Sequence, residues 1–97
     1  MTPPMMAVAL RSALAKMVKI ACGREASSIT TVARVSGGTC VYLALVDYHN
    51  RQALCDHLAQ QLQVRAEITG ARQLVFSRSD AVKIIDRTAG RGSSKEL

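Results

Sequence analysis

Aromatic residues are scarce in this chain of 97 residues, which has two tyrosines, one phenylalanine and no tryptophan. Proteins that bind single-stranded nucleic acid stack its bases on several exposed aromatic side chains. So few aromatic residues argue against that kind of binding. The core must instead be aliphatic, and the hydrophobic fraction of 48% is normal for a globular protein.

Closely spaced cysteine pairs are also absent. The three cysteines, Cys22, Cys40 and Cys55, are odd in number and far apart in the sequence. This pattern argues against a disulfide framework and a structural zinc site, and it favours a cytoplasmic or other reducing compartment. No apolar run approaches the roughly 18 residues that a membrane-spanning helix needs. We therefore predict no metal, no cofactor and no membrane span.

No group of residues has the spacing of a catalytic motif. Cys40, Asp47 and His49 are the residue types of a nucleophilic triad, but a buried thiol and a solvated histidine explain them better. Gly37 and Gly38 join two predicted strands, whereas a phosphate-binding glycine loop joins a strand to a helix. We predict no catalytic residues and favour a protein that is not an enzyme, with an enzyme kept as an alternative.

Acidic residues are missing from the start of the chain, where none occurs before Glu25. The whole chain has 13 basic and 7 acidic residues, and its formal net charge is +6. The excess of positive charge is concentrated at the two ends of the sequence. Such a distribution favours an anionic partner such as nucleic acid.

Hydrophobic periodicity predicts a single α+β domain over residues 1–88, with a flexible polar tail at residues 89–97. The element order is α-β-β-α-β-β-α, which predicts a four-stranded antiparallel sheet with helices packed on it. Helices are expected over residues 3–22, from Asp47 or Asn50 to residue 62, and from Ser77 to residue 88. Strands are expected over residues 28–36, 39–46, 64–69 and 73–76.

Apolar stripes at helical spacing predict which side of each helix faces the core. In the first helix these residues are Met6, Leu10, Ala13, Leu14, Met17 and Ala21. In the second they are Leu54, Leu58 and Leu62 with Cys55 and Ala59, and in the third Ala81, Val82, Ile84 and Ile85. The second strand is apolar at both odd and even positions, which predicts a central strand covered on both faces.

The two strand pairs have turn signals of different length. Gly37 and Gly38 predict a two-residue hairpin, because its turn needs positive φ angles that glycine adopts without strain. For the second pair we predict a three-residue loop, Gly70-Ala71-Arg72. This length places Leu74 opposite Ile68, so that apolar side chains share one face of the sheet.

Basic side chains on the predicted helix surfaces, strands and loops are the candidate contacts to nucleic acid. They lie on the first helix, on the sheet and its loop, and on the last helix. The candidates are Arg11, Lys16, Lys19, Arg34, Arg65, Arg72, Arg78, Lys83 and Arg87. Positive charge alone is sufficient for contacts to the phosphates of a duplex.

The element order, and the segment HNRQALCDHLAQQLQVRAEITGARQLVFSRSDAVKIIDR at residues 49–87, resemble the LAGLIDADG homing endonuclease unit. That family's signature ends the first helix, where a carboxylate binds the catalytic metal ion. The corresponding stretch here, VKIACGRE at residues 18–25, has Cys22 in place of the acid, and Glu25 follows the expected helix end. The resemblance implies DNA bound across a curved sheet and helix packing between two units.

These patterns predict a small, basic, non-catalytic domain that binds the backbone of duplex nucleic acid. One alternative is a protein-interaction adaptor or inhibitor whose basic surface meets an acidic partner. Another is a diverged LAGLIDADG-type homing endonuclease that uses Glu25. The apolar first helix, with Met5 and Met6, predicts either a homodimer seam or a helix buried in its own core.

Overall fold

The computed structural model describes residues 2–25 and 28–89 and confirms the predicted α+β fold. The elements are α1 (Pro3–Cys22), β1 (Ile29–Ser36), β2 (Thr39–Val46), α2 (Tyr48–Leu62), β3 (Glu67–Ile68), β4 (Leu74–Ser77) and α3 (Arg78–Thr88). The four strands form one antiparallel sheet in the order β1-β2-β4-β3. Of the predicted polar tail at residues 89–97, all residues after Ala89 lie outside the described part of the chain.

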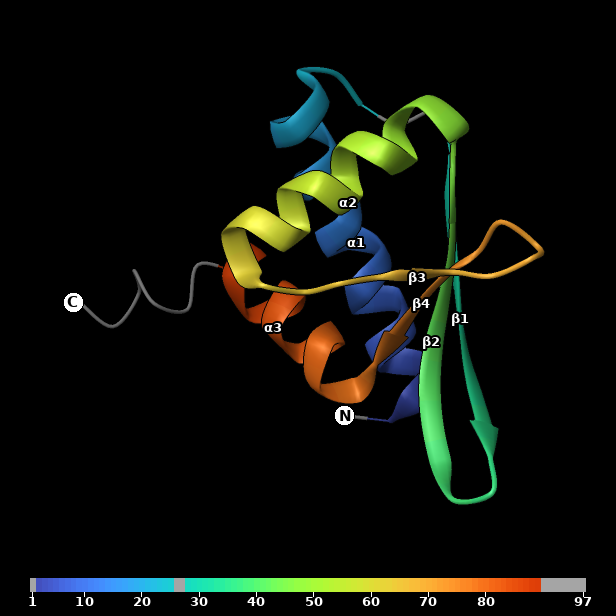
Figure 1. Ribbon diagram of the computed structural model, residues 1–97. Helices are drawn as coiled ribbons and strands as arrows, with labels where there is room; N and C mark the ends of the chain where they lie inside the picture. The colour runs from blue at the N-terminus through green and yellow to red at the C-terminus, as the bar shows by residue number, and fades with distance from the viewer. Residues whose placement is uncertain (1, 26–27, 90–97) are drawn as a thin grey trace, which may run out of the picture.

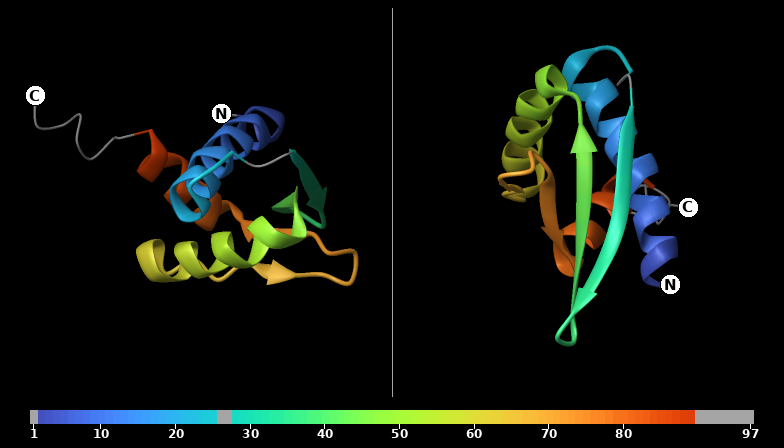
Figure 2. Two further views of the ribbon diagram at one scale, coloured as in Figure 1. Left: turned by 90° about the horizontal axis from the view of Figure 1, so that it is seen from above. Right: turned by 90° about the vertical axis from the view of Figure 1, so that its right-hand side faces the viewer.

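The three helices lie on one face of the sheet (Figures 1 and 2). No other element of the described chain covers the second face, which is turned toward the viewer in the right-hand view of Figure 2. The domain therefore has two layers. We call the second face the uncovered sheet face.

Helix α1 is the longest element and contacts β1, α2 and α3. Thr2 caps its start by accepting a hydrogen bond from the Met5 amide at 3.4 Å. The helix ends at residue 22 as predicted, and Gly23 caps it with φ at 77° and its amide donating to the Lys19 carbonyl. Two side-chain hydrogen bonds fix α1 against β1: Thr31 Oγ1 donates to the Ala7 carbonyl at 2.6 Å, and Arg11 Nε donates to the Ile29 carbonyl at 2.9 Å.

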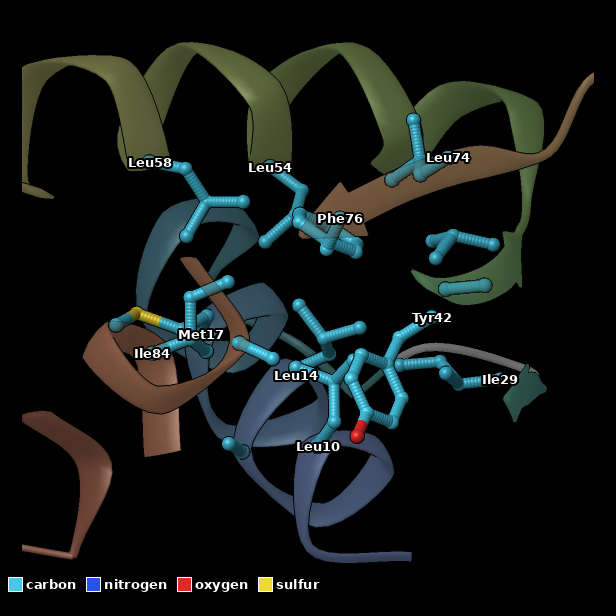
Figure 3. Packing of buried hydrophobic residues seen from close by; sticks show 14 of the residues in the cluster. Leu10, Leu14, Met17, Ile29, Tyr42, Leu54, Leu58, Leu74, Phe76 and Ile84 are labelled. Atoms are coloured by element: carbon cyan, nitrogen blue, oxygen red, sulfur yellow. The ribbon is translucent and has the colours of Figure 1, made fainter. Parts of the chain in front are cut away.

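The core lies between the helices and the inner face of the sheet (Figure 3). All predicted core residues of α1 are buried except Ala21, which is half-buried. The largest side chains with almost no solvent exposure come from both layers: Leu10 and Leu14, Tyr42, Leu54 and Leu58, Leu74 and Phe76, and Ile84. Burying each such aliphatic or aromatic side chain contributes on the order of 1.5–3 kcal/mol.

Both predicted turns are confirmed. Ser36 pairs with Thr39, and the two glycines between them have φ angles of 57° and 80°. In the second hairpin Ile68 pairs with Leu74, as the three-residue loop requires. Arg72 closes that loop at a φ of 63°, and its amide donates to the Thr69 carbonyl at 2.8 Å.

Three packing predictions are wrong. Strand β2 is central, but only one of its faces is covered, and Leu45 on the other face is 43% exposed. Val82 of α3 is 37% exposed, because α3 presents Ala81 and Ile84 to the core and Val82 projects away from both. Ala59 is exposed for the corresponding reason on α2, where Leu54 and Leu58 face inward. Strand β3 is also shorter than predicted, with only two residues.

Candidate nucleic-acid interface

The exposed side of α1 changes from apolar to basic along its length. Met5 and Val8 are 57% and 64% exposed near its start. Lys16 and Lys19 are exposed in the C-terminal half, where they border a shallow groove with Ala15, Ile20 and Glu25. The exposed charge of α1 beyond Arg11 is therefore positive, and among the described residues Glu25 is the one acidic residue that lines this groove.

A second groove, of about 280 Å³, lies where the three helices meet. Lys16 borders both grooves, so the two are adjacent. The lining residues come from all three helices: Lys16, Met17 and Ile20 from α1, His57 and Gln61 from α2, and Arg87 and Thr88 from α3. We call this second hollow the three-helix groove.

Helix α3 contributes a second pair of predicted cations to this side of the molecule. Lys83 and Arg87 are exposed and lie one turn apart, on the same side of the helix. Arg87 Nη2 donates to Gln61 Oε1 at 3.5 Å, a long and therefore weak hydrogen bond. The structure thus brings Lys16 and Arg87 to one groove from elements that are far apart in sequence, and Lys19 borders the adjacent groove with Lys16.

The other predicted cations are not brought to this cluster. Thr31 and Ala33 of β1 are half-buried and face the helices. Successive side chains of a strand point to opposite faces, so Arg34 lies on the uncovered sheet face, where it is paired with Val41 of β2. Arg65 precedes β3, Arg72 lies in the β3–β4 loop, and Arg78 begins α3, all three exposed. Arg11 is exposed too, but its guanidinium Nε is engaged by the Ile29 carbonyl.

The uncovered sheet face is mainly apolar. Leu43 lies at its centre and is only 7% exposed, because Val32 and Val75 are its neighbours on the two adjoining strands. Leu45 and Val41 extend this apolar surface along β2. A strand surface of this kind offers few donors to phosphate oxygens, so the charged sites of the fold lie chiefly elsewhere.

Sequence reasoning missed two polar residues of the three-helix groove, His57 and Gln61. They are four residues apart, which places them on one side of α2. That spacing is visible in the sequence. It identifies a shared helix side, but only the packing of α2 against α1 and α3 shows which basic residues face it.

The end of α1 carries the stretch that the LAGLIDADG resemblance, if it holds, would place at that family's signature. Cys22 is the last residue of the helix and is half-buried. Glu25 follows the helix end and is exposed. It borders a further groove, separate from the three-helix groove, with Arg24, Asp47, His49 and Asn50. In the described part of the chain, no three side chains of the His, Cys, Asp or Glu type are grouped closely enough to hold a metal ion.

The thiols are unpaired and half-buried. Burial raises the pKa of Cys55, and the neighbouring Asp56 carboxylate raises it further, so this thiol is a poorer nucleophile than an exposed one. Cys40 lies beside the buried hydroxyl of Tyr42. This contact and burial both raise the pKa of Tyr42, while the charge of Arg78 acts in the opposite direction.

Comparisons of the chain with protein-family models, with curated proteins and with solved structures find no match. Within the described residues, no helix is both long and apolar enough to cross a membrane.

Proposed function

We propose that this domain binds duplex nucleic acid through its phosphate backbone, using the basic surface formed by α1 and α3. The proposal depends on one observation: Lys16 and Lys19 of α1 and Arg87 of α3 border two adjacent grooves. Separated cations make weak contacts one at a time. Cations grouped on a rigid helical surface can neutralise several neighbouring phosphates in one bound geometry.

The composition of the surface favours duplex over single-stranded ligands. Tyr42 and Phe76, two of the three aromatic residues, are buried in the core and are unable to stack on bases. The apolar character of the uncovered sheet face favours the helical side as the interface. In this respect the proposal differs from the LAGLIDADG resemblance, which implies DNA bound across the sheet.

The test is fluorescence anisotropy with a labelled duplex, titrated at several salt concentrations. Each phosphate contact contributes about −0.9 to the slope of log affinity against log salt. Replacing Lys16 and Lys19 together with glutamine should therefore weaken binding and make the slope shallower by about 1.8. Glutamine and lysine have similar helix propensities, so α1 should remain intact.

The matched control is Arg34→Gln with Arg72→Gln, which removes the same charge from the sheet and its loop. We expect this control to bind nearly as tightly as the unchanged protein. If the control loses binding and the α1 variant does not, the interface is the sheet side. If the unchanged protein fails to bind any duplex at low salt, the proposed function is wrong, and an acidic protein partner becomes the better hypothesis.

We also propose that two copies of the chain associate through the first half of α1. Pro4, Met5, Val8 and Ala9 line an apolar groove there, and Met5 and Val8 expose more than half of their surface. Helix α1 can both pack in its own core and form a dimer contact, because Met6 and Leu10 face the core while Met5 and Val8 face outward. Association would remove the outer apolar side chains from water.

The compartment follows from the thiols. Three unpaired cysteines are stable in a reducing environment, so we propose that the protein works in one, such as the cytoplasm.

A further inference from the structure

The three-helix groove is lined by both basic and apolar side chains. Lys16, His57 and Arg87 approach it from three different helices, and none of its lining residues in the described chain is a carboxylate. Its volume is about 280 Å³. The groove is thus a small, cationic, concave site.

The groups that can donate to a ligand are few and identifiable. The hydroxyl of Thr88 donates to the carbonyls of Ile84 and Ile85 at 3.1 Å each, so Thr88 serves as a wall. Among the described residues, Arg87 is held only by the long contact to Gln61, and an anion can replace that contact at little cost. The lysine ammonium, the arginine guanidinium, the imidazole and the side-chain amide of Gln61 are therefore the available donors.

The groove also has an apolar part. Met17 forms its floor and is 2% exposed, while Ile20 at the rim is 66% exposed. A ligand that combines an anionic group with a less polar body would contact both parts. Nucleotides have this composition, with a phosphate group attached to a sugar and a base.

We infer that the three-helix groove binds a terminal phosphate group, either at the end of a nucleic acid strand or on a free nucleotide. This inference builds on the proposed binding of nucleic acid and adds a second kind of contact to it. A phosphodiester within a duplex has one negative charge and chain on both sides. A terminal phosphate has a charge of about −1.5 to −2 and chain on one side only, so it can enter a hollow walled by three helices.

The first arm of the test compares two duplexes that differ only in having a 5′-phosphate or a 5′-hydroxyl group, with the label at the 3′ end. Fluorescence anisotropy should show about tenfold tighter binding of the phosphorylated duplex, because charge-assisted hydrogen bonds are stronger than neutral ones. His57→Gln should remove most of this preference, so that the two duplexes bind the variant with similar affinity. His49→Gln, on the same helix but outside the groove, is the matched control and should keep the preference.

The second arm uses adenosine monophosphate and adenosine as probes, with amide chemical shifts measured by NMR. The monophosphate should shift the amides of Lys16, His57 and Arg87, and adenosine should not. A duplex preference assigns the groove to strand ends, and shifts with the monophosphate alone assign it to free nucleotides. If the two duplexes bind equally and neither small molecule shifts these amides, the inference is wrong. Salt-dependent binding of both duplexes would then still support the proposed function.

Discussion

Because the hydroxyl group of Tyr42 is buried, the free energy of unfolding of this domain should decrease as the pH rises into the alkaline range. Tyr42 has no exposed surface, and its hydroxyl has no hydrogen-bond partner of ordinary length among the described residues. Burying a hydroxyl without such a partner costs about 1–3 kcal/mol. The thiol of Cys40 lies beside it, but a thiol is only a weak donor and acceptor.

Tyr42→Phe removes the hydroxyl and keeps the ring. At neutral pH we expect the variant to be as stable as the unchanged protein or more stable, by up to about 2 kcal/mol. The effect of pH follows from the raised pKa of Tyr42 in the folded state. The stability that results from the difference in pKa between the folded and unfolded states is fully present below about pH 10, the ordinary pKa of tyrosine. It is lost as the pH rises toward the pKa of the folded state.

Above pH 10 the unfolded state releases the Tyr42 proton while the folded state keeps it. The free energy of unfolding of the unchanged protein should then fall by as much as about 1.4 kcal/mol per pH unit relative to Tyr42→Phe. Cys55, whose pKa is also raised, reduces the stability of both proteins at alkaline pH and therefore cancels in the comparison.

Urea denaturation followed by far-ultraviolet circular dichroism, at neutral pH and at several alkaline pH values, measures both effects. Two results would refute the reasoning. The first is a variant less stable than the unchanged protein by more than about 1 kcal/mol at neutral pH, since this loss would mean that the hydroxyl makes a good hydrogen bond. The second is a stability difference that stays constant above pH 10.

Two further predictions concern the first hairpin and the proposed association. Gly38→Ala should destabilise the domain by about 1–2 kcal/mol, because φ is 80° there and the added methyl group meets no neighbouring atom, so that the cost is conformational. Gly70→Ala is the control for the same measurement of unfolding, since Gly70 has equal space and no left-handed φ, and it should be nearly neutral. For association, sedimentation equilibrium should show a dimer that Val8→Glu dissociates and that Val35→Glu, at a similarly exposed position on β1, leaves intact. A monomeric unchanged protein would contradict the association.

Local signals in the sequence were sufficient for the order of elements and for both turns. Gly23 and the Gly37-Gly38 pair mark places where the backbone must adopt positive φ angles, and a single residue type reports such places directly. The match of Ile68 with Leu74 followed from the alternation of apolar residues. These features depend on neighbours in sequence and need no knowledge of the rest of the fold.

Features that depend on packing between distant elements were not predictable. The apolar pattern of β2 indicates burial on two faces, but whether a second layer exists is decided by the number of helices and by their side of the sheet. In the same way, the sequence identifies Lys16 and Arg87 as surface cations. Only the packing of α1 against α3 shows that they border one groove with His57, whereas Arg34 lies on the other side of the sheet.

The two-sided apolar pattern of β2 also affects how the sheet reaches its correct alignment during folding. If β2 slipped by one residue against its neighbours, Leu43 and Leu45 would replace Tyr42 and Ala44 on the inner face. Hydrophobicity alone discriminates poorly between these two arrangements, because both bury apolar side chains. The two-glycine turn, which fixes the pairing of β1 with β2 from one end, therefore selects the native alignment of these two strands.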